Sequence, residues 1–287
     1  MPNLFDELQM GTISRRRLFQ LLSAAGGSAA LAAAQSKQAK SPQPAGAAPK
    51  ISPANIGGGG RIERDFYREW VKTSKVPMAE GFSILDATKQ EVQPWPETAG
   101  RGLYLNFSGN VHMDAVIQEI PSGKALEANR HFYEQFAYVL SGRGYTTFGG
   151  GKGNKVEWGE GSLFAVPMNL LHRHYNSDSA HPARLLLMTT FPFMLQVFGS
   201  QGLINDLNFS FNERYDGAAD YFSSTARVRK RWDKTNFVKD IRSSEVVLWE
   251  ERGEGNASMF WDMAGNTILE PHMSEFDVGS YLSLIHI

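Results

Sequence analysis

The sequence predicts an all-β fold over residues 102–200, either a closed barrel or a sandwich of short strands. Two observations carry this prediction. Short apolar or alternating runs follow one another, separated by Gly, Pro or Asn: LYLNF, AVIQEI, FAYVLSG, YTTF, KVEW, SLFAVP and ARLLLMTT. No helix-length periodic segment lies between them, and evenly spaced short strands with turn residues are typical of these architectures. The length of 287 residues allows one large domain or two smaller ones.

The first 34 residues resemble a bacterial twin-arginine export signal. Arg16 and Arg17 are followed by Phe19, and an apolar stretch rich in Gly and Ala runs on to Ala34. This stretch is short for a membrane span, and it ends in small residues suited to cleavage. The resemblance implies the twin-arginine translocation machinery as a partner and a periplasmic or otherwise exported location. An ordinary secretory signal or a retained anchor are the alternatives.

A linker and a helix are expected between this signal and the strands. Residues 35–60 are rich in Pro, Gly, Ala and Ser without an apolar period, which predicts a flexible linker. In residues 61–73, Ile62, Phe66 and Trp70 recur every four residues with charges between them. That spacing predicts a helix packed on the domain that follows.

Composition and charge exclude several classes of function. The formal net charge is −1, which gives no reason to expect nucleic acid or an anionic membrane surface as a partner. The chain has no cysteine, so disulfides, thiolate metal sites and cysteine nucleophiles are excluded. A metal would need His, Asp, Glu, Asn or Gln ligands, which suit iron, manganese, nickel, copper or zinc.

Two stretches in the β region carry histidines at regular spacings. The first contains Asn129, His131 and Gln135 and ends in the Ser141-Gly142 turn. The second is GSLFAVPMNLLHRHYN, which spans residues 161–176. Because side chains alternate along a strand, residues of equal parity face the same side. The two stretches are therefore expected to point imidazoles at one place inside a barrel, and Glu134, of opposite parity, to point away.

Together these stretches resemble the two motifs of the cupin superfamily. The second motif matches at Gly161, Pro167, His172 and Asn176, with Asn169 in place of a glycine. The first motif matches at His131 and Gly142. It departs at Asn129, where the family often has another His, and at Gln135, where it has a Glu. The resemblance implies a cupin barrel, also called a double-stranded β-helix or jelly roll, in a domain that spans residues 61–200 with its N-terminal helix.

The resemblance also implies a site. His131 and His172 stand at positions that hold a divalent metal in the family, with Fe, Mn, Ni, Cu or Zn as candidate ions. Asn129, Gln135 and His174 are expected to line the pocket or to add ligands. The alternative is a barrel that has lost its metal and keeps these side chains as hydrogen-bonded pocket residues.

Several phrases, RHFYE, YVLSGRGYTTF and HRHYN among them, resemble bacterial proteins with two cupin domains. Residues 201–240 are then a connector, and residues 241–281 are the start of a truncated second cupin domain. The last six residues, 282–287 (LSLIHI), can be encoded by the end of a common sequencing transposon. We expect them to be a non-native tail and the natural chain to continue past Tyr281.

Two functions follow from this resemblance. The first is an exported, metal-dependent oxidoreductase of dioxygenase type, acting on a small oxygen-bearing aromatic substrate. The second is a non-catalytic periplasmic barrel that binds a small molecule without metal. Pairing of cupin barrels in the family also implies a homodimer.

Overall fold

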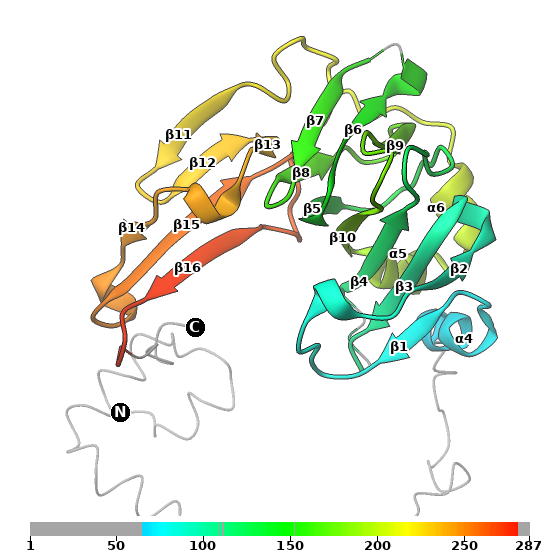
Figure 1. Cartoon of the computed structure of the whole chain (residues 1–287), viewed down its shortest axis with the longest axis horizontal. Coiled ribbons are helices and arrows are strands. Elements are labelled where there is room, and N and C mark those ends of the chain that lie inside the picture. Colours follow the sequence, from blue (N-terminus) through cyan, green and yellow to red (C-terminus); the bar gives the residue numbers. More distant parts are fainter. Residues whose placement is uncertain (1–64, 109, 111, 152, 281–287) are drawn as a thin grey trace, which may run out of the picture. The chain divides into compact units, whose positions relative to one another are not determined.

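The computed structural model describes residues 65–280, apart from residues 109, 111 and 152 (Figure 1). Several predicted segments lie outside this part of the chain and stay predictions: the signal at 1–34 with Arg16, Arg17 and Phe19, the linker at 35–60 and the tail at 282–287.

Two sheets make up the predicted barrel, and the all-β prediction is confirmed. The larger sheet runs in the order β1-β3-β4-β10-β5-β8-β13, with β2 paired to β3, and the smaller one in the order β7-β6-β9. Their strands can be followed in Figure 1: β1 (Met78–Glu80), β2 (Gln93–Trp95), β3 (Gly100–Asn106), β4 (Asp114–Ile120), β5 (Gln135–Ser141), β6 (Arg143–Phe148), β7 (Lys155–Gly159), β8 (Leu163–Val166), β9 (His172–Asn176), β10 (Ala183–Thr189) and β13 (Phe237–Val238).

The alternation of β10 explains how the sequence forms the barrel wall. Ala183, Leu185, Leu187 and Thr189 are buried, and the residues between them are only half-buried. Strand β5 repeats the pattern, and its Gln135 pairs with Thr189 in the antiparallel register. Because directly opposed residues point to the same face, one side of the wall is a continuous inner surface.

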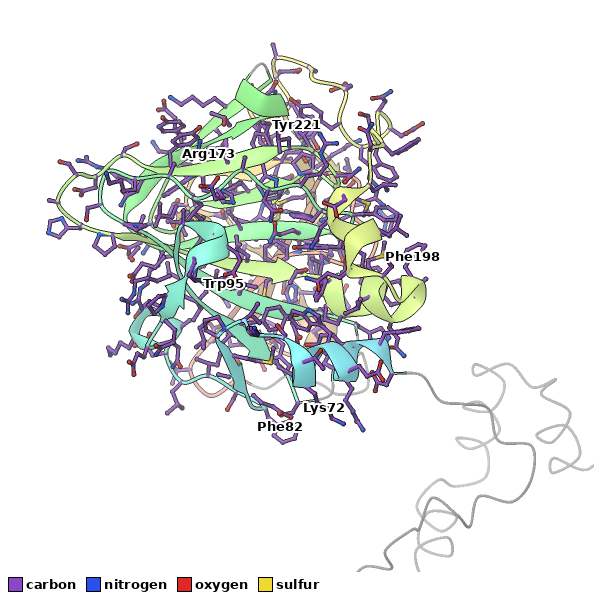
Figure 2. The ribbon with its side chains drawn as sticks, turned by 90° about the vertical axis from the view of Figure 1, so that its right-hand side faces the viewer. Lys72, Phe82, Trp95, Arg173, Phe198 and Tyr221 are labelled. Carbon is purple, nitrogen blue, oxygen red and sulfur yellow. The ribbon has the colours of Figure 1, made fainter. Side chains whose placement is uncertain are left out.

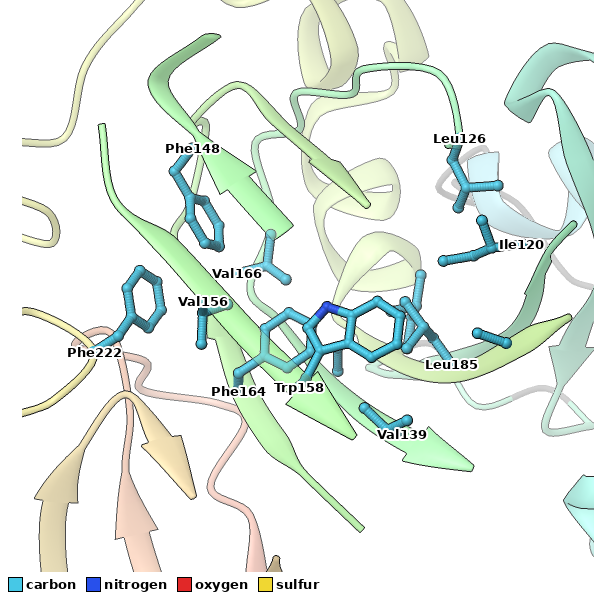
Figure 3. Packing of buried hydrophobic residues seen from close by; sticks show 13 residues of the cluster. Ile120, Leu126, Val139, Phe148, Val156, Trp158, Phe164, Val166, Leu185 and Phe222 are labelled. Atoms are coloured by element: carbon cyan, nitrogen blue, oxygen red, sulfur yellow. The ribbon is translucent and has the colours of Figure 1, made fainter. Parts of the chain in front are cut away.

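This inner surface is apolar over most of its area. Buried side chains from six strands and from the segment after β10 pack together, as Figure 3 shows for residues that include Phe148, Phe164, Val139 and Leu185. Trp158 stacks on Phe164 with the ring planes 7° apart. Each such side chain contributes roughly 1.5–3 kcal/mol when fully buried, so this cluster is the main source of the barrel's stability.

Helices cover the barrel on the side of β3. The helical segments are α4 (Phe66–Thr73), α5 (Phe191–Phe198) and α6 (Gln201–Asp206), and the short 3-10 helices are η2 (Ala87–Lys89), η3 (Pro96–Thr98), η4 (Gly149–Gly151), η5 (Ile241–Ser243) and η6 (Glu250–Arg252).

The described part of the expected N-terminal helix is confirmed. Asp65 caps it by accepting from the Arg68 amide at 2.8 Å, and Trp70 packs edge-on against Tyr104 and Phe191.

No pattern in the sequence predicts α5, since FPFMLQVF is short and apolar on nearly all sides. Such a segment cannot be distinguished from a buried strand by its pattern. Among the described residues, no helix is long and apolar enough to cross a membrane.

A further sheet follows the barrel, in the order β11-β12-β15-β14 with β16 paired to β15. Its strands are β11 (Thr225–Arg229), β12 (Trp232–Thr235), β14 (Val247–Leu248), β15 (Asn256–Asp262) and β16 (His272–Phe276). The segment expected as a connector, 201–240, therefore contains a helix and three strands. The new sheet lies against the outer face of β5 and β8, where Leu163 and Ala165 pack with Met259 and Trp261.

Candidate functional site

A cavity of about 540 Å³ opens on the inner surface of the barrel. Tyr104, Val116 and Leu187 stand opposite one another on β3, β4 and β10 and form part of its wall. Gln135 of β5 and Thr189 of β10 stand opposite each other and also line the cavity. Trp95, labelled in Figure 2, also lines the cavity.

Strand β9 places two histidines in the same cavity. Its burial alternates, so His172 and His174 are both buried at 4% exposure and both line the cavity. Their ring centroids are 5.3 Å apart. Pairing with β6 sets Thr146 beside His174 and Phe148 beside His172. The two imidazoles lie on one face of the strand, as expected for residues two positions apart.

The segment before β5 brings His131 to this place, although it is not a regular strand. The backbones of Asn129 and His172 exchange two hydrogen bonds, at 2.8 and 2.9 Å. The His131 ring then lies 5.1 Å from the His172 ring, centroid to centroid, and stacks on Tyr133 at 3.9 Å. His131 is only 1% exposed and stands behind the cavity wall that Tyr133 and Gln135 form.

Asn129 does not point into the barrel beside His131 and Gln135, as the alternation of side chains along a strand had predicted. Its side chain is exposed, at the edge of the cavity, and its Oδ1 accepts from the Arg130 amide at 2.7 Å. Parity does not apply here because the chain bends at residues 132 and 133. Glu134 behaves as expected: its carboxylate points away from the cavity and binds the backbone of residues 267–269.

The three buried imidazoles are neutral at pH 7. Burial, reinforced by the neighbouring imidazole of His172, lowers the pKa of His131 to about 3. Burial alone lowers the pKa of His172 to about 4, and burial with both neighbours lowers that of His174 well below its ordinary value. The cavity therefore contains polar rings without formal charge.

The hydrogen bonds of His131 follow from its neutrality. Its Nδ1 lies 3.2 Å from the Tyr133 carbonyl oxygen, which can only accept. Its Nε2 lies 2.7 Å from Oε1 of Gln135, which also accepts, whereas a neutral ring has only one proton to donate. The two ends of an amide have nearly the same shape, so both contacts are satisfied when the ring proton is on Nδ1 and the Gln135 amide is turned with its NH₂ group toward Nε2.

The residues present do not complete a metal site. Among the described residues, no group of three or more His, Asp or Glu side chains is placed to hold a metal ion. The 2.7 Å between His131 and Gln135 is a hydrogen-bond distance, whereas two ligands of one ion at ~2.1 Å lie ~3.0–3.4 Å apart. The nearest carboxylate, Glu134, is bound elsewhere. The three imidazoles are not placed to hold one ion together, which leaves at most two of them and no carboxylate, a poor donor set for a divalent ion.

Three polar residues of this region have no signature in the sequence: Thr146, Tyr133 and Thr189. A lone Thr or Tyr gives no spacing pattern. Their roles depend on register, which sets Thr146 opposite His174 and Thr189 opposite Gln135.

Residues 116–189 match the model of the family described as Cupin domain. The barrel is a cupin barrel. No curated protein matches the chain. The cupin fold predicted from the two motifs is thereby confirmed, and the matched segment includes both histidine-bearing stretches.

Solved structures with similar barrels come from several organisms. A variant of the salicylate 1,2-dioxygenase from Pseudoaminobacter salicylatoxidans, in complex with gentisate, is 24% identical with a TM-score of 0.31, and the match covers 38% of this chain and 31% of that one. An RmlC-like cupin from Shewanella frigidimarina is 18% identical, with a TM-score of 0.31 and coverages of 38% and 88%. The polyketide cyclase RemF from Streptomyces resistomycificus is 17% identical, with a TM-score of 0.33 and coverages of 37% and 78%. The chain thus spans about a third of the dioxygenase that it matches.

Proposed function

We propose that this cupin barrel binds a small, uncharged organic molecule in its cavity and needs no metal ion to do so. One observation carries the proposal: a cavity of about 540 Å³ whose buried polar residues include neutral histidines, while the two carboxylates that line it, Glu97 and Glu127, are exposed. Cavities of this size hold small ligands. Aromatic and aliphatic side chains, including Trp70, Tyr104 and Leu187, supply the apolar contacts.

Tryptophan fluorescence tests this proposal, because Trp70 and Trp95 line the cavity. Uncharged phenols, aromatic ketones and carboxamides are titrated into the folded protein, and hits are measured by calorimetry. Replacing His172 with alanine removes a buried hydrogen-bonding group and is expected to weaken binding about tenfold, which corresponds to ~1.4 kcal/mol. The control is His181→Ala, because the His181 side chain is 80% exposed. Equal affinities of the His172→Ala variant and the wild type would place the ligand outside this cavity.

A metal-dependent oxidoreductase of dioxygenase type is the second candidate, and one observation favours it. Nδ1 of His131 and Nδ1 of His172 both face backbone carbonyl oxygens, at 3.2 and 3.0 Å. Metal-binding histidines often donate in this way, which leaves Nε2 for the ion. Elemental analysis after reconstitution with iron, manganese, nickel, copper and zinc decides between the candidates. We expect less than one ion per chain. One ion per chain, lost in both His131→Ala and His172→Ala, would support the oxidoreductase and justify a screen of phenols under O₂.

Export belongs to the same proposal and is supported by the sequence alone. Arg16, Arg17 and Phe19 lie in the twin-arginine-like signal. A reporter fused after residue 60 should reach the periplasm, and the Arg16→Lys, Arg17→Lys double variant should remain in the cytoplasm. Equal export of both fusions would favour an ordinary secretory signal.

A further inference from the structure

We propose that Thr146 is a positioning residue that fixes His174 as a hydrogen-bond donor beside the acceptor His172, so that the cavity selects ligands with a donor next to an acceptor. Carboxamides and hydroxy-ketones belong to this class. The inference rests on the proposed function, since it specifies which small molecules the cavity takes.

The first step concerns the hydroxyl of Thr146, which is fully buried. The Trp158 indole N–H can only donate, and it donates to Thr146 Oγ1 at 3.0 Å. The same oxygen lies 2.7 Å from His174 Nδ1. In the described part of the chain, this ring nitrogen is the one acceptor within bonding distance of the hydroxyl proton. Thr146 therefore donates to Nδ1, because the other assignment leaves its proton buried without a partner.

The second step follows from this hydrogen bond. Nδ1 of His174 accepts and so carries no proton, and an imidazole ring keeps at least one ring proton, which is therefore on Nε2. The arrangement is held in place by packing. The indole of Trp158 lies against Gly144, where an added Cβ would be 2.5 Å from the ring. Any other residue at this position would displace the indole that holds Thr146.

The third step sets His172 in the opposite tautomer. Its Nδ1 lies 3.0 Å from the Leu170 carbonyl oxygen, which only accepts, so Nδ1 carries the proton. The cavity lining contains no buried carboxylate that could pair with a charged ring, so the ring has this one proton and Nε2 has a lone pair. His172 and His174 thus offer the cavity an acceptor and a donor on neighbouring rings, with centroids 5.3 Å apart.

This pair discriminates between ligands of the same shape. A carboxamide accepts from His174 through its C=O and donates to His172 through its NH₂. A carboxylate has acceptors only, so one of its oxygens would face the His172 lone pair. Benzamide and benzoate are matched probes, because they differ little in size.

The tautomer itself is measured first, without any ligand. Nitrogen-15 spectra of labelled histidine distinguish protonation at Nδ1 from protonation at Nε2, and a His174→Gln variant assigns the signals. We expect Nε2–H for His174 in the wild type and in Thr146→Ser, which keeps the hydroxyl. Thr146→Val has nearly the same shape without the hydroxyl and should lose this preference. A His174 signal of the Nδ1–H type in the wild type overturns the inference even if Thr146→Val fails to fold.

Binding of the two probes is measured next, on the wild type and both variants. We expect benzamide to bind at least about tenfold more tightly than benzoate to the wild type and to Thr146→Ser, with a ratio near one for Thr146→Val. A benzoate preference in the wild type overturns the ligand class. If the tautomer is as expected and neither probe binds, the ligand class fails together with the proposed function. If both bind equally to a wild type with the Nδ1–H tautomer, only this inference fails.

Discussion

Replacing Glu134 with glutamine is expected to lower the free energy of unfolding by about 3–5 kcal/mol. The Glu134 side chain is 3% exposed and pairs with Arg214 at 3.1 Å. Its two oxygens also accept from the backbone N–H groups of Thr267, Ile268 and Leu269 at 2.8–3.0 Å. These bonds outweigh burial and lower its pKa. A glutamine loses the charge and turns an NH₂ group toward donors, which leaves Arg214 without its partner.

Urea denaturation of the wild type and Glu134→Gln measures this loss. Glu157→Gln is the matched control, because Glu157 is 77% exposed and pairs with Lys155 on the surface. We expect no measurable change from the control, since exposed ion pairs contribute little. Hydrogen exchange gives a local measure: the amides of residues 267–269 should lose protection in Glu134→Gln. Unchanged denaturation midpoints would show that the contacts of this buried carboxylate with Arg214 and residues 267–269 do not stabilise the fold.

Asp114 is expected to make the folded protein less stable as the pH rises. Its side chain is fully buried, Oδ1 accepts from the Phe107 amide at 3.0 Å, and Oδ2 has no hydrogen-bond partner among the described residues. Burial raises the pKa of Asp114 from 3.8 to about 7, against the lowering effect of the Phe107 bond. Because the folded-state pKa is the higher one, its contribution to stability is complete below pH ~4 and is lost as the pH rises through about 7.

Three pKa units correspond to roughly 4 kcal/mol between pH 4 and pH 8. Asp114→Asn removes the ionisation. Its NH₂ group can serve Oδ1 of Asn106, which has no hydrogen-bond partner among the described residues and directly follows the Leu105–Ala115 pair of the β3–β4 register. We therefore expect a more stable variant at pH 8 and a flatter profile of stability against pH. Denaturation midpoints at several pH values measure this. The exposed Asp220→Asn is the control, and a wild-type profile as flat as that of Asp114→Asn would contradict the prediction.

The strands of the barrel were predictable because short apolar or alternating runs are separated by turn residues, and in β5, β6, β9 and β10 burial has a period of two. In β10, Leu185 and Leu187 alternate with half-buried neighbours, but these neighbours include the apolar Leu186 and Met188, so the sequence marks the strand as an apolar run and not which side of it faces inward. Helix α5 was not predictable, since Phe191 and Leu195 belong to a segment that is apolar nearly all round. In such a segment, contacts with the rest of the fold decide between helix and strand.

The site was predictable to a smaller extent. The parity rule brought His172 and His174 together because both lie on one regular strand. It did not apply to Asn129, which belongs to an irregular segment held by backbone bonds to His172. The tautomer of His174 depends on a threonine 28 residues away, and this partner is known only once the pairing of β6 with β9 is known.

The short strand β13 protects the barrel from self-association. All four residues of β8, Leu163–Val166, are buried and apolar, and Phe237 and Val238 pair with this strand along its outer edge. Without β13, β8 would be an open, hydrophobic sheet edge, which is a template for pairing with another chain. A fragment that ends before residue 237 would therefore form oligomers or aggregates through β8, even with every residue of the cavity in place.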